Sequence, residues 1–245
     1  MKVPRLRGVI ERRILVNYRV DPAALRGVLP APFRPHLVDN VAIAGICLIR
    51  LSAVRPPLVP AALGIASENA AHRIAVEWSD AGVTRRGVYI PRRDSSSRLN
   101  RFLGGRLFPG IHHAARFDVR EDGDQLRVKM DSATAHVLVD GQVGSALPRD
   151  SVFRSMDAAS DFFEQGALGY SATRRPGRFD GLELRTLVWR IEPLQVRAVE
   201  SSFFEDRSHF PPGATAFDCA LLMRNVAHEW RARDPLCLDE ALAAA

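Results

Sequence analysis

Short runs of apolar and β-branched residues recur along the first part of the chain, and they predict strands. Residues 8–18 (GVIERRILVNY) predict the first strand. Asp21, as an N-cap followed by a proline, predicts a short helix that continues to Leu29. Residues 41–54 are apolar enough for a buried strand, in which Gly45 marks a bulge or a close backbone approach.

The pattern continues as further strands bounded by turn residues. These predicted strands are residues 66–78, 83–90, 112–120, 125–130 and 134–139. The turn at residues 79–82 joins the first two of them as a hairpin. A second turn, at Asp140 and Gly141, is predicted to end the last of them.

The second half of the chain adds one helix and three strands to the prediction. Asp157 predicts the cap of a helix over residues 156–165, and its Phe162 and Phe163 are expected to dock on the sheet. The later strands are predicted at residues 182–191, 194–199 and 216–223.

Many short strands with a few short helices are typical of a mainly β (α+β) fold built on a mainly antiparallel sheet or barrel. No linker or internal repeat divides the 245 residues, so one domain is expected over residues 1–245. Residues 1–7 and 238–245 are expected to be peripheral tails.

Composition and charge narrow the classes of function. The net charge of +6 favours an anionic partner, but the arginines are interspersed with acids, and no basic block is interleaved with aromatics as nucleic-acid binding would require. Apolar runs are too short for a membrane span or a signal peptide, which predicts a cytoplasmic protein without membrane contact. Three widely spaced cysteines suit reduced thiols and form no zinc pattern.

Several motifs of common enzymes are missing from the sequence. There is no P-loop and no GxGxxG, so nucleotide chemistry has no support. His228-Glu229 lacks the second histidine of a zinc protease, because Ala232 stands there, and Ser145 is not flanked by the glycines of a nucleophile elbow.

The densest group of candidate functional residues lies in residues 88–117 (VYIPRRDSSSRLNRFLGGRLFPGIHHAARF). Arg92 and Arg93, followed by Asp94 and three serines, suit an anion clamp or, equally, a helix cap with surface ion pairs. A helix is predicted over residues 96–103. Arg106 follows two glycines that permit close packing, so it is the better candidate for a buried arginine.

The adjacent His112 and His113 point to opposite faces if they lie on a strand, so at most one of them enters an interior. An inward histidine near an arginine is a candidate acid or base, whereas a metal site has little support. Glu68 lies among small apolar residues, where an ionised carboxylate is costly unless paired. It is therefore either a cavity acid or the structural partner of an arginine.

Several segments of the chain resemble the domain-of-unknown-function 2071 proteins of the acetoacetate decarboxylase-like superfamily. The segments are YRVDPAALRGVLPAPF, GVYIPRRDSSS, GGRLFPGIHH, SVFRSMDAASDFFEQGALGYS, LRTLVWRIEPLQV and FPPGATAFDCALLMRNVAHEW. The resemblance implies a cone-like antiparallel β-barrel that encloses a small-molecule cavity, in a homo-oligomer.

In true acetoacetate decarboxylases a lysine in a GRExxGxPKK-type segment forms a Schiff base with the substrate. Setting Gly105-Arg106 on that segment places His113 where the lysine would be. Lys2 and Lys129 lie outside it, so Schiff-base decarboxylation is not expected unless Lys129 reaches the cavity from another strand. Glu68 matches the family's cavity glutamate. The substrate-steering arginine falls at Arg12, or at Arg13 if the register slips by one.

These observations predict a cavity protein that binds a small anionic carboxylate or carbonyl compound without a cofactor or a metal. One hypothesis is lyase or hydro-lyase chemistry, in which His113 or Glu68 moves a proton and an arginine holds the carboxylate. The alternative is a non-catalytic ligand-binding or sensor protein on the same scaffold. The residues predicted to bind the ligand are Arg106, Arg12, Arg92, Arg93, His112 and Tyr89.

Overall fold

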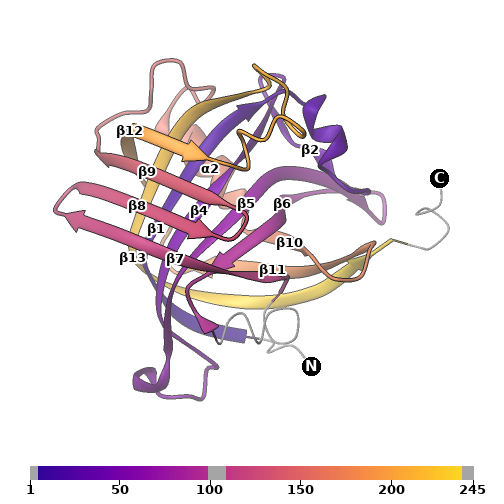
Figure 1. Cartoon of the computed structure of the whole chain (residues 1–245). Coiled ribbons are helices and arrows are strands. Elements are labelled where there is room, and N and C mark those ends of the chain that lie inside the picture. The colour runs from indigo at the N-terminus through magenta and orange to yellow at the C-terminus, as the bar shows by residue number, and fades with distance from the viewer. Residues whose placement is uncertain (1–4, 99–108, 239–245) are drawn as a thin grey trace.

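The fold is mainly β, as predicted (Figure 1). The computed structural model describes residues 5–98 and 109–238, and the strands within them form one thirteen-stranded sheet. In chain order the elements, with η marking 3-10 helices, are β1 (Arg5–Val20), η1 (Ala24–Gly27), β2 (Arg34–Pro35), β3 (Leu37–Val38), β4 (Val41–Arg55), η2 (Ala61–Leu63), β5 (Ile65–Asp80), β6 (Val83–Ser95), β7 (His112–Asp122), β8 (Gln125–Ser132), β9 (His136–Val143), α2 (Met156–Gln165), β10 (Leu168–Ala172), β11 (Arg178–Thr186), β12 (Glu192–Ser201) and β13 (Thr215–Cys237).

The sheet is mixed: it is mainly antiparallel, as predicted, but it contains two parallel pairs that were not predicted. β6 pairs in parallel with β7 and also with β10, while the other neighbouring strands are antiparallel. A parallel pair needs a connection of about a dozen residues or more, and the segment between β6 and β7 is that long. Two additional pairings, β5 with β6 and β11 with β13, join strands that are distant along the rest of the sheet.

The strands β1, β4 and β5 lie side by side at the centre of the sheet and are buried on both faces. This explains the nearly continuous apolar run of β4, which lacks the alternation of a half-exposed strand. One core covers the face turned to β8 and β9, where Met130 and Val137 are fully buried. The second core lies on the opposite face, against α2 and its buried Phe163.

Two local predictions are wrong. After Asp21 only the short 3-10 helix η1 forms, because Gly27 and Pro30 leave too few residues for a stable α-helix. Asp140 and Gly141 do not form a turn but lie within β9. A Cβ on Gly141 would lie 2.6 Å from the carbonyl oxygen of Gln195, so glycine serves here for close approach of two strands.

The helix α2 spans the predicted residues, and Phe163 docks as expected. Its cap, however, is Ser155, whose Oγ accepts a hydrogen bond from the backbone N–H of Ala158 at 3.1 Å. Asp157 lies in the first turn, where its charge suits the helix dipole.

The remaining differences concern element boundaries. β11 ends at Thr186, so residues 187–191 lie outside it, whereas β13 extends well beyond the predicted residues 216–223 to Cys237. β1 begins at Arg5, so part of the expected N-terminal tail belongs to the sheet. The helix predicted over residues 96–103 falls mostly outside the described residues. Within those that are described, no helix is long and apolar enough to cross a membrane.

Candidate functional site

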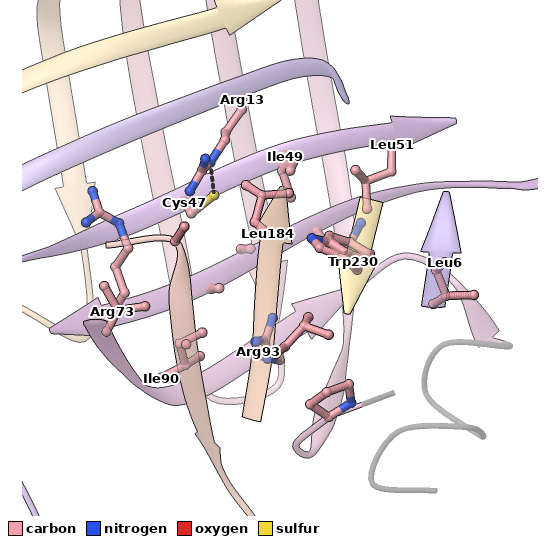
Figure 2. A pocket seen from close by; sticks show the side chains of 18 of the residues that line it. Leu6, Arg13, Cys47, Ile49, Leu51, Arg73, Ile90, Arg93, Leu184 and Trp230 are labelled. Atoms are coloured by element: carbon pink, nitrogen blue, oxygen red, sulfur yellow. Dashed lines mark hydrogen bonds between the residues drawn. The ribbon is translucent and has the colours of Figure 1, made fainter. Parts of the chain in front are cut away.

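A cavity of about 140 Å³ is lined by residues of β1, β4, β5 and β6 on one side and of α2, β10 and β11 on the other. Figure 2 shows some of the side chains that line it. Its apolar walls include Ile49, Leu51, Ile90, Leu184 and Trp230. The polar side chains on the same walls include three arginines, a histidine and a thiol, described below. Few polar groups in a mostly apolar concave site are typical of small-molecule sites.

The register of the strands brings Cys47, Arg93 and His112 into one row. Cys47 on β4 is paired with Ala71 on β5, Ala71 with Arg93 on β6, and Arg93 with His112 on β7. Directly paired residues present their side chains on the same face of a sheet. Because Ala71 is small, the space between the Cys47 thiol and the Arg93 guanidinium stays open, and all four residues line the cavity.

A second row holds Arg73 in place. Gly45 on β4 is paired with Asn17 on β1 and with Arg73 on β5. A Cβ on Gly45 would lie 2.1 Å from the carbonyl oxygen of Val16, so the predicted close approach is confirmed. Since Gly45 has no side chain, Nη2 of Arg73 reaches across it and donates a hydrogen bond to Oδ1 of Asn17.

The cavity arginines have neutral partners. Nε of Arg13 donates to Sγ of Cys47 at 3.3 Å, and Nε of Arg93 donates to Oγ of Ser171 at 3.0 Å. Nε of Arg73 and Nη1 of Arg13 are buried without a hydrogen-bond partner in the described part of the chain. No carboxylate within residues 5–98 and 109–238 forms an ion pair with any of the three.

Burial weakens the charge of these arginines without removing it at neutral pH. It lowers the pKa of Arg73 to about 10 and the pKa of Arg93 to about 10, while the nearby Cys47 acts in the opposite direction on both. The charge of Arg13 lowers the pKa of Arg73 further. The cavity is therefore electropositive.

His112 supplies a neutral imidazole to the same cavity. Its Nδ1 is buried and has no hydrogen-bond partner among the described residues. Burial, reinforced by the charge of Arg93, lowers the pKa of His112 to about 3. A neutral imidazole can accept a proton or a hydrogen bond from a ligand. Asp94, the acidic residue at the cavity margin, instead accepts two bonds of 2.8 Å from Arg92.

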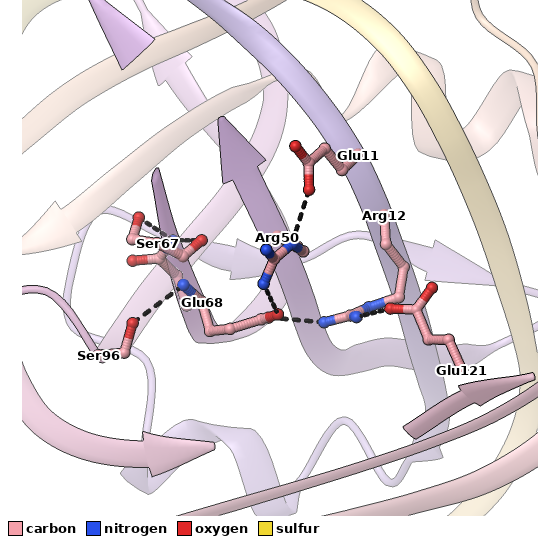
Figure 3. A network of polar contacts seen from close by, with 8 residues as sticks. Glu11, Arg12, Arg50, Ser67, Glu68, Ser96 and Glu121 are labelled. Atoms are coloured by element: carbon pink, nitrogen blue, oxygen red, sulfur yellow. Dashed lines mark hydrogen bonds and ion pairs between the residues drawn. The ribbon is translucent and has the colours of Figure 1, made fainter. Parts of the chain in front are cut away.

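Glu68 and Arg12 lie together, but on the face opposite the cavity (Figure 3). Nη2 of Arg12 lies 2.6 Å from Oε2 of Glu68, and Arg12 also pairs with Glu121 on β7. Nη1 of Arg50 lies 3.1 Å from the other oxygen of Glu68. Glu68 thus forms ion pairs with two arginines and does not line this cavity. Because successive strand residues alternate between faces, Arg13 lines the cavity instead of Arg12.

The other predicted site residues are distributed as follows. Arg93 and His112 line the cavity, whereas Arg92 pairs with Asp94, and His113 is exposed. The two histidines therefore lie on opposite faces of the strand, as was predicted for adjacent strand residues. Tyr89 is buried against Phe33 in the core on the face away from the cavity, with ring centroids 5.4 Å apart.

Two further predicted positions concern the decarboxylase comparison. Arg106 lies outside the described residues. Lys129 lies on β8, where its side chain is 48% exposed and its Nζ is 3.1 Å from Asp131, and it does not line the cavity.

Arg73 and Cys47 were not singled out from the sequence. A signal was nevertheless present, because Ser67, Asn69 and Arg73 are separated by even numbers of residues along β5 and therefore share the face that lines the cavity. Cys47 carried no comparable signal, since it lies within an apolar run.

The sequence matches the profile of the domain-of-unknown-function 2071 family, described as an uncharacterized conserved protein, over residues 9–222. The chain belongs to this family. A comparison with curated protein sequences finds no significant match.

Solved structures with the acetoacetate decarboxylase-like fold are similar to this chain over almost its whole length. Acetoacetate decarboxylase from Legionella pneumophila is 12% identical, with a TM-score of 0.62 over 96% of this chain and 88% of that one. An acetoacetate decarboxylase-like enzyme from Sphingomonas wittichii is 13% identical, with a TM-score of 0.60 over 98% and 94%. The enduracididine biosynthesis enzyme MppR complexed with pyruvate is 11% identical, with a TM-score of 0.60 over 98% and 92%. At these identities the likeness establishes the fold.

Proposed function

We propose that the cavity binds a small organic anion, a carboxylate that also carries a carbonyl group, through Arg13, Arg73 and Arg93. The observation that carries this proposal is the absence of a paired carboxylate at these three arginines within the described residues. Burying a charged group costs on the order of several kcal/mol unless a group of opposite charge is buried with it. A carboxylate ligand would supply that charge and would accept charge-assisted hydrogen bonds from the guanidinium groups.

The dimensions and lining of the cavity limit the ligand to a small one. An apolar cavity of about 150 Å³ holds a molecule the size of benzene, which has about six non-hydrogen atoms. The cavity of about 140 Å³ therefore suits a short 2-oxo carboxylate, with the carboxylate at the arginines and the remainder against Ile49, Ile90 and Leu184. Pyruvate, which MppR binds, has this size and chemistry.

The scaffold in this proposal is one domain whose sheet closes as a cone-like barrel around its cores. The β5–β6 and β11–β13 pairings support closure, because they join strands distant along the sheet. A lysine-dependent mechanism has no support, since Lys129 is exposed on β8 and Lys2 lies outside the described residues. Lyase or hydro-lyase chemistry here would use His112, rather than His113, as the proton acceptor, because the unpartnered Nδ1 of His112 belongs to the cavity wall.

A binding or sensor function is the second candidate, and the ion pairs of Glu68 favour it. Both oxygens of that carboxylate are held by arginines on the opposite face. Among the described residues, the cavity then has a neutral imidazole but no free carboxylate. These groups are sufficient to bind an anion, but they provide few acids or bases for catalysis.

Isothermal titration calorimetry with pyruvate and with pyruvamide tests the binding proposal, because the two differ mainly in charge. We expect pyruvate to bind and pyruvamide to bind at least about ten-fold more weakly, as hydrogen bonds to charged groups contribute about 1.5–3 kcal/mol. Arg93→Met is expected to lower pyruvate affinity by a similar factor. Arg197→Met, which removes an exposed arginine paired with Asp140, is the matched control.

Equal affinity for pyruvate and pyruvamide, or equal losses in Arg93→Met and Arg197→Met, would contradict the proposal. Turnover of a bound 2-oxo or hydroxy acid, followed by NMR, separates the two candidate functions. Loss of turnover with retained binding in His112→Gln supports the enzyme. Absence of turnover for every ligand that binds supports the sensor.

A further inference from the structure

The thiol of Cys47 lies among the cavity arginines, and the function proposed above does not use it. Cys47 lines the cavity and is 8% exposed. Its Sγ accepts a hydrogen bond from Nε of Arg13 at 3.3 Å (Figure 2). In the register of the sheet only the small Ala71 on β5 lies between Cys47 and Arg93.

A second and independent feature of the site is the buried cation of Arg73. This residue is 5% exposed, lines the same cavity, and leaves Nε without a hydrogen-bond partner among the described residues. Together with Arg13 and Arg93, this residue places three cations around the cavity that Cys47 lines. Reactive cysteines are found in electropositive, partly accessible surroundings of this kind.

The other two cysteines lack this environment. Cys219 is fully buried and does not line the cavity, and burial, with the adjacent Asp218, raises the pKa of its thiol. Cys237 is exposed at the end of β13, and its contact with Arg178 is a long one of 3.8 Å. The chain therefore carries one exposed and one buried internal control for the reactivity of Cys47.

We propose that Cys47 is a nucleophile that adds reversibly to the carbonyl carbon of a small 2-oxo carboxylate held by the cavity arginines, an inference that rests on the proposed function. In this step the sulfur–carbon bond forms and the carbon–oxygen π bond breaks. The electron pair moves to the oxygen, and the proton lost by the thiol ends on that oxygen. The product is a hemithioketal, so the step needs no oxidant or reductant.

Competitive alkylation tests the reactivity of Cys47 directly. Iodoacetate and iodoacetamide are similar in size but differ in charge, and peptide mass spectrometry follows all three cysteines in one sample. Relative to Cys237, we expect Cys47 to prefer iodoacetate over iodoacetamide by about ten-fold or more, the factor expected from one charged hydrogen bond. Pyruvate should protect Cys47 but not Cys237, and Arg93→Met should remove the preference while Arg197→Met retains it.

The covalent step has its own readout in the NMR spectrum of pyruvate labelled with ¹³C at its carbonyl carbon. We expect a new tetrahedral-carbon signal with the native protein and none with Cys47→Ser. Retained calorimetric binding of pyruvate without Cys47 alkylation or a tetrahedral signal would overturn this inference and leave the proposed function standing. Loss of pyruvate binding itself would overturn both.

Discussion

The two faces of the central strands carry the same residue type in opposite electrostatic situations. On one face, Arg12 is 1% exposed and lies between the carboxylates of Glu68 and Glu121 (Figure 3). On the other face, Arg13 and Arg73 are directed to the cavity and have only neutral partners among the described residues. On the first face carboxylates compensate the arginine charge, whereas the described part of the second face provides no carboxylate for Arg13 and Arg73.

The difference arises between adjacent residues. In two pairs of adjacent arginines, one arginine forms an ion pair with a carboxylate and the other lines the cavity. These pairs are Arg12 and Arg13 on β1, and Arg92 and Arg93 on β6. The period of two along a strand produces this division without any difference in residue type. A buried arginine therefore indicates an anion site only when its face of the sheet provides no carboxylate.

The largest expected effect is the difference in stability between Arg12→Met and Arg13→Met. Removing Arg12 leaves Glu68 buried with a weaker set of partners, which is expected to lower the free energy of unfolding by about 3–5 kcal/mol. Removing Arg13 takes away a cation without a carboxylate partner, so stability should stay within about 1 kcal/mol or rise. Urea denaturation measures both variants, and equal losses would show that the two faces do not differ.

An intermediate effect is expected on acidification, because each face also carries a histidine whose pKa is lowered. Burial lowers the pKa of His72, on the face of Arg12, to about 3, and it lowers the pKa of His112, at the cavity, to about 3. Below the ordinary value of 6.5 the unfolded chain binds a proton that the folded chain does not. Stability is therefore lost as the pH falls from about 6.5 toward 3, by up to about 1.4 kcal/mol per pH unit for each histidine.

The variant His72→Phe isolates the contribution of the face of Arg12. Its new ring would pack against Phe203, whose ring centroid lies 4.7 Å from that of His72. Urea denaturation between pH 6.5 and 5 should give a flatter dependence for this variant than for the native protein. An unchanged slope would mean that His72 does not resist protonation.

The smallest effect on stability is expected for Arg50→Gln, at the edge of the ion-pair network around Arg12 and Glu68. The Arg50 side chain is 47% exposed, and its ion pairs with Glu11 and Glu68 are open to water. Exposed pairs contribute about 0–1 kcal/mol, so the free energy of unfolding should change by less than about 1 kcal/mol. If Arg50→Gln lowered the free energy of unfolding as much as Arg12→Met, the exposed ion pairs of Arg50 would contribute as much stability as the buried ones of Arg12.

Local patterns predicted much of the fold. The strands around residues 8–18, 41–54 and 66–78 are confirmed, as is the helix of residues 156–165, because their apolar spacing and flanking turn residues act locally. The prediction failed at Gly141, since a glycine after an aspartate is typical of a turn. In the structure Gly141 instead lets β12 approach β9 closely, and this depends on Gln195, which is distant in the sequence.

The candidate site was predictable only in part. His112 and Arg93 were among the predicted ligand-binding residues and line the cavity, and the rule of opposite faces implied that His112 and His113 would separate. The sequence did not show which histidine would line the cavity, or that Arg73 would join Arg93 there. Both depend on the pairing of β4 to β7.

The sequence by itself determined the mainly β character of the protein, its arginine-rich composition and the absence of a lysine from the decarboxylase-like segment. Only the tertiary structure decided which arginines meet a carboxylate. Arg12 and Glu68 are 56 positions apart, and a register shift of one residue would place Arg12 at the cavity instead of Arg13. Charge compensation is thus a property of strands brought together in space, and the same residues in another register would give a different site.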